Sequence, residues 1–246
     1  MSKQRRFLAL GSAAVLALGL TACGDDSGDG GSGGDGGGDT LQVGIKFDQP
    51  GLGFQEGDSY SGFDVDVANY VAEELGQEVE FVQAPSPQRE TLLETGQVDM
   101  IFATYSITDA RKEKVSFAGP YLITGQSLLV REDNTDITGK DSLANNKILC
   151  SVSGSTPAQK IKDEFPSVQL QQYDTYSACI DALKNGAVDA VTTDEVILAG
   201  FAAQRPDAFR LVDMVLPKDT CVDGRLRSAG APFSVERYGI GLAHGD

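Results

Sequence analysis

Apolar residues fall into two alternating patterns along the chain after residue 40. Short apolar runs, typical of buried strands, occupy residues 41–45, 79–82, 101–103 and 148–152. Between these runs, apolar residues recur every three or four positions, which indicates amphipathic helices. Because strands and helices alternate in this order, the pattern predicts an α/β fold with a largely parallel sheet.

The clearest of the predicted helices begins after Gly62 and ends at Gly76, a residue type that commonly terminates helices. Four apolar residues share one face of this helix and are expected to pack on the sheet: Phe63, Val67, Val71 and Leu75. Residues 46–60, which precede the helix, are rich in Gly and Pro and predict a loop.

One short pattern occurs twice, ninety residues apart, at residues 93–99 and 183–189. Both copies read as the end of a helix, a glycine and the start of a strand. Eight positions beyond each glycine lie Thr104 and Asp194, at equivalent strand ends. Two α/β lobes that face each other across a cleft would bring these residues together; a generic helix–glycine–strand pattern is the alternative.

Residues 101–121 contain the strongest candidate for a binding site. Thr104 and Ser106 follow a buried strand, and Thr108 is a good N-cap that places Arg111 in the first turn of a helix. Open α/β sheets bind ligands at the carboxyl ends of their strands, and a guanidinium group among hydroxyl and N–H groups suits a carboxylate. The alternative is a surface arginine beside hydroxyl groups that already have partners.

A second place for a carboxylate follows the strand at residues 148–152. Thr156 is a good N-cap with Pro157 at the first helical position, so the N–H groups of this helix would point into the cleft. A capped helix beside a glycine turn is also common without any ligand.

The amino terminus has the features of an export signal. Basic residues at positions 3, 5 and 6 precede an uncharged run that is too short for an ordinary membrane-spanning helix. Residues 1–22 therefore predict a signal peptide, and the small residues before Cys23 predict lipidation of that cysteine, which would anchor the protein to the outer face of the cell membrane. A secretory signal with an incidental cysteine is the alternative. Residues 23–40, mostly Gly, Asp and Ser, predict a flexible tether.

The charge of the chain limits its partners. The formal net charge is −16, and it becomes −19 when the three basic residues of the signal peptide are removed. An acidic surface argues against binding to nucleic acid, and an anionic ligand would need a local cationic pocket. His244 is the only histidine, so no Cys/His set for a metal exists and we predict neither a metal site nor a cofactor.

The chain has four cysteines, and an exported protein meets an oxidising environment. Cys150 ends a strand-like run and Cys179 lies on a predicted helix, so we expect a disulfide between them. Cys221 would then be left over, either free or in competition for the same bond.

Four motifs resemble those of a known family. They are GFDVDVA at 62–68, GQVDMIFATYSITDARKEKVSFAGPY at 96–121, SVSGSTPAQ at 151–159 and NGAVDAVTTDE at 185–195. With these motifs the chain resembles, from about residue 41 to 246, the polar-amino-acid binding proteins of ABC importers, and most of all the glutamate-binding lipoproteins. The resemblance implies the type II periplasmic-binding-protein fold, in which two α/β lobes with mainly parallel sheets enclose a ligand cleft.

The resemblance also sets the expected lobe boundaries. Residues 41–126 and 242–246 are expected to form lobe 1, and residues 127–241 lobe 2, with hinge strands at its ends. Relatives usually continue with helices that pack on lobe 1, and we expect this chain to lack them. Residues 216–231 look inserted and predict an irregular loop.

Roles in the family carry over to matching positions of this chain. The resemblance implies that Arg111, with Thr104 and Ser106, binds the α-carboxylate of an amino acid, and that Thr156 adds hydrogen bonds from the second lobe. Asp194 matches the carboxylate that receives the α-ammonium group. An amino acid needs both charges because it carries a carboxylate and an ammonium group a few ångströms apart.

The residues implied for the ligand side chain are Lys46, Ser86, Arg89 and Tyr176. Lys46 and Arg89 match the positions where relatives place cations for the distal carboxylate, so Arg89 is predicted to distinguish glutamate from glutamine. The alternative for both cations is a solvated position on the surface, which is usual for Lys and Arg.

The function implied is a monomeric, membrane-anchored receptor that binds free glutamate and delivers it to the membrane subunits of an ABC importer, without catalysis. Aspartate and glutamine are the rival ligands. A periplasmic-binding-fold enzyme such as a dehydratase is the rival from another class, and a sensory input domain is a third. An enzyme would need an acid or base with a shifted pKa in the cleft.

Overall fold

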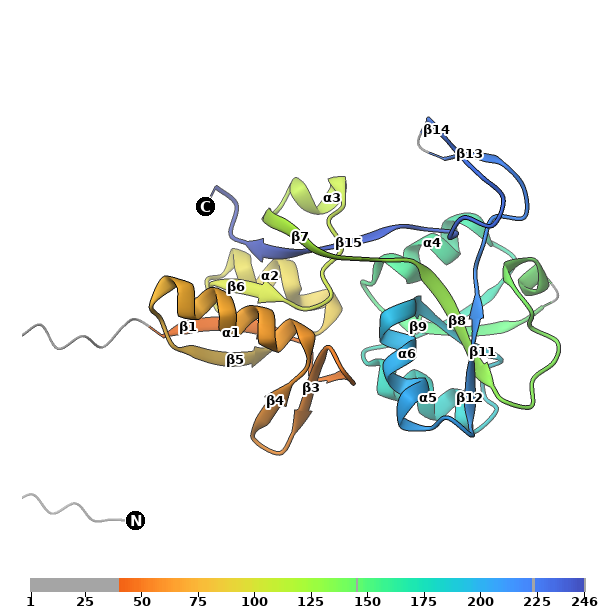
Figure 1. Ribbon diagram of the computed structural model, residues 1–246, viewed down its shortest axis with the longest axis horizontal. Coiled ribbons are helices and arrows are strands. Elements are labelled where there is room, and N and C mark those ends of the chain that lie inside the picture. Colours follow the sequence, from red (N-terminus) through yellow and green to blue (C-terminus); the bar gives the residue numbers. More distant parts are fainter. Residues whose placement is uncertain (1–39, 145, 223, 246) are drawn as a thin grey trace, which may run out of the picture. The chain divides into compact units, whose positions relative to one another are not determined.

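A computed structural model describes residues 40–144, 146–222 and 224–245, which form two lobes (Figure 1). The predicted signal peptide at 1–22, the lipidation at Cys23 and all but the last residue of the tether lie outside these ranges. No helix within the described ranges is both long and apolar enough to cross a membrane.

Lobe 1 is built on a five-stranded sheet. Its strands, in spatial order, are β5 (Val79–Gln83), β1 (Leu41–Ile45), β6 (Met100–Phe102), β15 (Glu236–Leu242) and β7 (Ser116–Thr124). The pairs of β1 with β5 and with β6 are parallel, whereas β15 is antiparallel to both of its neighbours. The helices of this lobe are α1 (Phe63–Leu75), α2 (Arg89–Glu94) and α3 (Asp109–Lys112), with a 3₁₀ turn η1 (Ser86–Gln88) before α2.

Lobe 2 repeats this plan. Its strands, in spatial order, are β10 (Gln169–Tyr173), β9 (Ile148–Val152), β11 (Ala190–Asp194), β8 (Gln126–Arg131) and β12 (Phe209–Asp213). Only β8 runs antiparallel to its two neighbours. The helices are α4 (Thr156–Glu164), α5 (Tyr176–Lys184) and α6 (Glu195–Gln204), with a 3₁₀ helix η2 (Lys140–Ala144). In each sheet four strands therefore share one direction.

Two chain segments connect the lobes, and they touch each other. The first passes from β7 through Gly125 to β8, and the second returns from β12 to β15 (Figure 1). The backbone N–H of Gln126 donates to Ser234 Oγ at 3.2 Å, which ties the two segments together. β15 pairs in the sheet of lobe 1 from Glu236 onward. The chain therefore returns to lobe 1 at residue 236, earlier than the expected residue 242.

Two segments expected to be irregular contain strands. The loop predicted at residues 46–60 contains β2 (Asp48–Gln49), β3 (Gly53–Glu56) and the start of β4 (Ser59–Ser61), which form a small antiparallel sheet. Residues 216–231 contain the hairpin of β13 (Thr220–Val222) and β14 (Arg225–Arg227), which projects from lobe 2 in Figure 1. Both predictions were wrong because backbone pairing between neighbouring segments, rather than an apolar pattern, forms these short strands.

The buried face of α1 differs from the predicted one. Val67 and Val71 of the predicted face are partly buried against the core, but Phe63 and Leu75 are exposed, at 40% and 52%. The helix instead buries a face rotated from the predicted one, made of Asp64, Val65, Ala68 and Ala72. Asp64 takes a buried place in this face because its carboxylate accepts hydrogen bonds from the Thr104 N–H and the Tyr121 hydroxyl group.

The repeated pattern has the same structure in both lobes. Each copy ends a helix at a glycine with positive φ, 65° at Gly96 and 72° at Gly186. Asp99 and Asp189 then each accept a 2.8 Å hydrogen bond from a backbone N–H group of β1 and of β9, respectively. The repeat therefore marks the same helix-to-strand unit in each lobe.

The expected disulfide between Cys150 and Cys179 is present and joins β9 to α5 inside the core of lobe 2. Cys221 is free and exposed.

Removal of this disulfide should lower the stability of the protein markedly. The bond closes a loop with a sequence separation of 29 residues, for which chain entropy gives about 3–4 kcal/mol. We expect the melting temperature of the Cys150→Ala/Cys179→Ala variant to fall by about 10 °C in differential scanning calorimetry. Cys221→Ala is the matched control and should melt like the wild type; equal melting of all three proteins would contradict the prediction.

Candidate functional site

A small cavity lies where the two lobes meet. Lobe 1 contributes Ser86, Arg89, Thr104 and Ser106, and lobe 2 contributes Ser155, Thr156, Pro157, Tyr176, Asp194 and Ile197. Its volume is about 10 Å³, which is room for about one water molecule. A larger molecule could enter only if the lobes separated, so the structure is a closed conformation.

Seven of the nine side chains predicted to contact a ligand line this cavity. The other two, Lys46 and Arg111, donate hydrogen bonds to residues in its wall. The fold therefore gathers all nine residues, which the sequence spreads over almost 150 positions, around one point.

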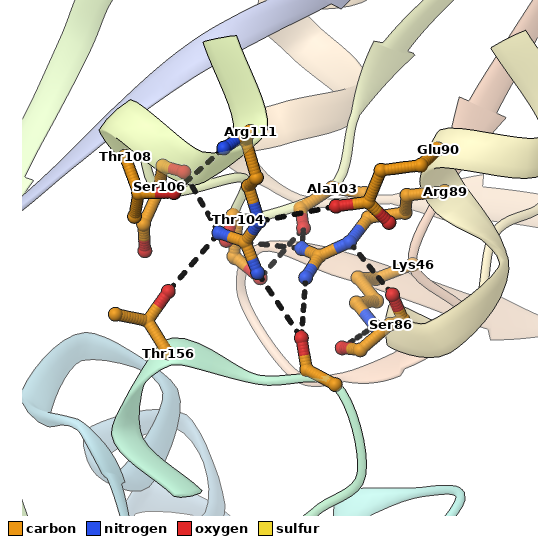
Figure 2. Close-up of polar contacts among 11 residues, drawn as sticks. Lys46, Ser86, Arg89, Glu90, Ala103, Thr104, Ser106, Thr108, Arg111 and Thr156 are labelled. Carbon is orange, nitrogen blue, oxygen red and sulfur yellow. Dashed lines mark hydrogen bonds and ion pairs between the residues drawn. The ribbon is translucent and has the colours of Figure 1, made fainter. Parts of the chain in front are cut away.

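Arg111 is held from lobe 1 and reaches toward lobe 2 (Figure 2). Thr108 caps the short helix α3 as predicted, because its hydroxyl group accepts from the Arg111 backbone N–H. The Arg111 Nε lies 3.2 Å from Glu90 Oε1, and Nη1 donates to the Ser106 carbonyl at 2.7 Å. The guanidinium group lies over the ring of Tyr105, 4.8 Å from its centre. These contacts fix its orientation, so Arg111 is not a solvated surface residue.

The remaining contacts of Arg111 cross to lobe 2. Nη1 donates to Thr156 Oγ1 at 3.0 Å, and Nη2 donates to the Gly154 carbonyl at 3.1 Å (Figure 2). Ser155, not Thr156, is the N-cap of α4, and its hydroxyl group accepts from the Ala158 N–H. The predicted cap was one residue too late. This register leaves the Thr156 hydroxyl group available to Arg111.

Thr104 has an unusual backbone conformation that Asp64 stabilises. Its φ is 44°, in the left-handed region that a β-branched residue rarely adopts. Asp64 Oδ2 accepts from the Thr104 N–H at 2.7 Å, and Oδ1 accepts from the Tyr121 hydroxyl group at 3.0 Å. Asp64 is fully buried, and this burial raises its pKa to about 6 despite the two donors.

Lys46 is a buried cation with few partners. It is 2% exposed, and its Nζ donates to Ser86 Oγ at 2.8 Å. Burial, followed by the neighbouring charge of Arg89, lowers the pKa of Lys46 to about 7. An ammonium group in such a place is stabilised by any anion that comes within reach.

Arg89 is equally buried, but backbone oxygens use its donors. The guanidinium group donates to the carbonyl groups of Ser86 at 3.3 Å, Ala103 at 2.9 Å and, in lobe 2, Gly154 at 3.4 Å (Figure 2). It also lies 4.3 Å from the centre of the Tyr105 ring. Burial, then the charge of Arg111, lowers its pKa to about 10. Arg89 therefore holds the wall of the site together, and the surface alternative is wrong for both Arg89 and Lys46.

Asp194 stands at the end of β11 and begins α6, as predicted. Its Oδ2 accepts from the Tyr238 hydroxyl group at 2.6 Å, whereas Oδ1 is buried with no hydrogen-bond partner among the described residues. Burial, then the charge of Glu236, raises the pKa of Asp194 to about 8. One carboxylate oxygen is therefore available to a hydrogen-bond donor in the cavity.

Tyr176 forms the floor of the cavity at the start of α5. Its hydroxyl group accepts from Thr193 Oγ1 at 2.5 Å. Burial, then the charge of Asp194, raises its pKa to about 12, so the phenol stays neutral at ordinary pH.

The chain was compared with known protein families and with individual relatives. The model of the bacterial extracellular solute-binding proteins, family 3, matches residues 41–165. The glutamate-binding protein GluB of Corynebacterium efficiens is 50% identical over the whole chain and 84% of its own length. The chain belongs to this family of solute-binding proteins. A glutamine-binding protein of Geobacillus stearothermophilus is 36% identical over 82% of this chain and 72% of its own length.

Solved structures of amino-acid-binding proteins have the same fold as this solute-binding protein. An ancestral arginine-binding protein bound to arginine matches with a TM-score of 0.70 and 30% identity, over 84% of this chain and 85% of its own. The type II periplasmic-binding-protein fold is thereby confirmed.

Some residues of this solute-binding protein's site were missed at the level of sequence. Glu90 orients Arg111, Asp64 stabilises Thr104, and Gly154 brings its carbonyl group to both arginines. A Cβ atom on Gly154 would lie 2.9 Å from Pro87 Cα, so only glycine permits this approach of the lobes. The motif at 62–68 contains Asp64, but the predicted buried face of this helix included only apolar residues.

Replacement of Asp194 by asparagine should change how stability depends on pH. The pKa of Asp194 is near 3.8 in the unfolded chain and about 8 in the fold, so the folded state holds a proton that the unfolded state has lost. The wild type therefore loses stability as the pH rises from about 4 to 8. The Asp194→Asn variant has no charge to bury at this position, so we expect its melting temperature, relative to wild type, to be about 10–20 °C higher at pH 9 than at pH 4. If calorimetry shows the same dependence of melting temperature on pH for the variant and the wild type, the raised pKa of Asp194 is refuted.

Proposed function

We propose that this chain is an extracytoplasmic receptor that binds glutamate between its lobes and delivers it to the membrane subunits of an ABC importer. Membership of the solute-binding family supports the class of function, and the relative named as a glutamate-binding protein supports the ligand. We further propose that the receptor is a monomer anchored through a lipidated Cys23, and that it performs no chemical transformation.

The observation that carries the choice of glutamate is the buried Lys46. Its ammonium group has no ion-pair partner in the described part of the chain, and its one hydrogen-bond acceptor is Ser86. A distal carboxylate would neutralise this charge and raise the lowered pKa again. The neutral amide of glutamine would bring no opposite charge to the ammonium group, and the shorter side chain of aspartate would reach less far toward it.

The other end of the site suits the groups common to all amino acids. An α-carboxylate could replace Thr156 and Gly154 as the acceptor of the Arg111 donors, because those two contacts come from the opposite lobe. An α-ammonium group could donate to Asp194 Oδ1, which has no other partner among the described residues. One ligand would then bond Arg111 in lobe 1 and Asp194 in lobe 2, so binding favours closure.

The shifted pKa values of Lys46 and Asp194 have an explanation without catalysis. Each group is perturbed by burial in the closed protein, and each has a complementary charge on a bound glutamate. An enzyme would need a reacting bond beside one of these groups, and a turnover assay with the bound amino acid would reveal it.

Isothermal titration calorimetry tests this function on the purified chain from residue 24 onward. We expect tight, saturable binding of L-glutamate and binding of L-glutamine and L-aspartate that is at least about ten-fold weaker, since a buried charge must otherwise stay unpaired. No heat with any of the three amino acids, from protein that circular dichroism shows to be folded, would refute the proposal. Tighter binding of glutamine would keep the receptor class but replace the ligand.

A further inference from the structure

A segment of lobe 1 is docked on lobe 2 outside the cavity. We propose that residues 48–52, in the turn from β2 to β3, are a latch that stabilises the closed conformation without touching the ligand. None of these residues lines the cavity. The proposal rests on the proposed function, because the latch acts on the affinity for the bound amino acid. Three independent contacts support it.

The first contact is a charged cap across the lobes. Asp48 Oδ2 accepts from the backbone N–H groups of Tyr176 at 2.7 Å and Ser177 at 3.1 Å, the first two residues of α5. Asp48 is 8% exposed. A carboxylate at a helix N-terminus gains from both the unpaired N–H groups and the helix dipole. Separation of the lobes would break both hydrogen bonds.

The second contact is apolar. Leu52 is 5% exposed, and it belongs to a cluster whose other buried members all come from lobe 2. Among them are Ile180 of α5 and Leu198 of α6. When the lobes open, this leucine leaves the core of the opposite lobe and becomes exposed to water, which opposes opening.

The third contact is a close backbone approach. A Cβ atom on Gly200, in the middle of α6, would lie 2.1 Å from the carbonyl oxygen of Pro50. No side chain other than hydrogen fits there while the latch is docked. The close approach of Pro50 thus explains why α6 contains a glycine at position 200, although glycine weakens helices.

The latch has a defined effect on binding. It stabilises the closed state equally whichever amino acid lies in the cavity, because it makes no contact with the ligand. Loss of the latch should thus lower the affinity for every ligand by the same factor and leave their ratio unchanged. It should also speed dissociation while association stays nearly constant, since docking follows the first encounter with the ligand.

Gly200→Ala is the sharpest test. The added methyl group must displace Pro50, while alanine favours the helix more than glycine does. We expect the melting temperature of the ligand-free protein to stay equal or rise, and the affinity for glutamate to fall about 10- to 100-fold, the usual value of lost hydrogen bonds to a charged group. The glutamate-to-glutamine ratio should not change. Wild-type affinity in Gly200→Ala would overturn the latch.

Ala203→Gly is the matched control on α6. Residue 203 is exposed near the end of the helix, so this variant should lose thermal stability and keep its affinity. Asp48→Ala should reproduce the affinity loss of Gly200→Ala from the other side of the contact. Because the charge of Asp48 also raises the pKa of Lys46, the ratio of glutamate to glutamine is read from Gly200→Ala, and a changed ratio there would refute the latch.

Small-angle X-ray scattering of the ligand-free proteins separates the latch from the proposed function. If the wild type binds glutamate, the glutamate affinities of wild type and Gly200→Ala test the latch. If it binds none of the amino acids tried, the proposed function fails, and the latch is judged by the radius of gyration alone. We then expect a larger radius for Gly200→Ala than for wild type, and equal radii would overturn the latch.

Discussion

Replacement of Arg111 by alanine should weaken the binding of glutamate about a thousand-fold, the largest effect expected of any single change in this protein. Arg111 faces lobe 2, and its donors reach Thr156 and Gly154 in the closed structure. Without Arg111, the α-carboxylate would enter the closed cavity and lose the guanidinium group that neutralises its charge. Titration calorimetry with glutamate and glutamine measures the loss, which should be similar for the two ligands because both carry the same α-carboxylate.

Lys112→Ala is the control for this change. Lys112 is the next residue of the same helix, but its side chain is 55% exposed and its ion pair with Asp109 lies at the surface. Exposed pairs of this kind contribute little, so binding should stay at the wild-type level. Arg111→Lys keeps a charge but loses the planar fork, and should bind between the two extremes. Glutamate affinity in Arg111→Ala within ten-fold of wild type would remove Arg111 from the binding site.

Replacement of Lys46 by methionine should abolish the preference for glutamate over glutamine. Methionine fills a similar space without the charge, so the distal carboxylate loses its cation and its affinity should fall about 100-fold, whereas glutamine should change less than about five-fold. The same variant should be more stable without ligand, because burial of the Lys46 ammonium group opposes folding, as its pKa of about 7 indicates. Higher stability together with lost selectivity is a result that simple damage to the fold would not produce.

Two controls separate the roles of the buried cations. Lys114→Met changes an exposed lysine and should alter neither selectivity nor stability. Arg89→Ala should weaken the binding of glutamate and glutamine together, because its guanidinium group holds the carbonyl groups of Ser86, Ala103 and Gly154. If Arg89→Ala alone changed the preference between the two ligands and Lys46→Met did not, the distal carboxylate would belong to Arg89, as the resemblance implied.

Local sequence predicted those features that depend on near neighbours in the chain. Thr108 caps α3 and places Arg111, Gly76 ends α1, and Asp194 precedes α6, because capping and termination are decided within one helical turn. The repeat at 93–99 and 183–189 predicted two similar units, and the cysteines in β9 and α5 predicted their disulfide. Composition also predicted that an acidic protein would need a local cationic site for an anionic ligand.

Tertiary structure alone decided the features that depend on contacts between distant segments. Asp64 is buried and stabilises the backbone of Thr104, although the predicted buried face of its helix included only apolar residues. The donors of Arg89 are used by backbone carbonyl groups of both lobes, whereas Lys46 donates only to Ser86 among the described residues. Only the folded structure shows this difference between the two cations. The latch at residues 48–52 reads in the sequence as an ordinary Gly/Pro turn, and its meaning appears only beside Gly200 of α6. These properties arise from burial and from partners that lie 14 to 150 residues away along the chain, which no local pattern encodes.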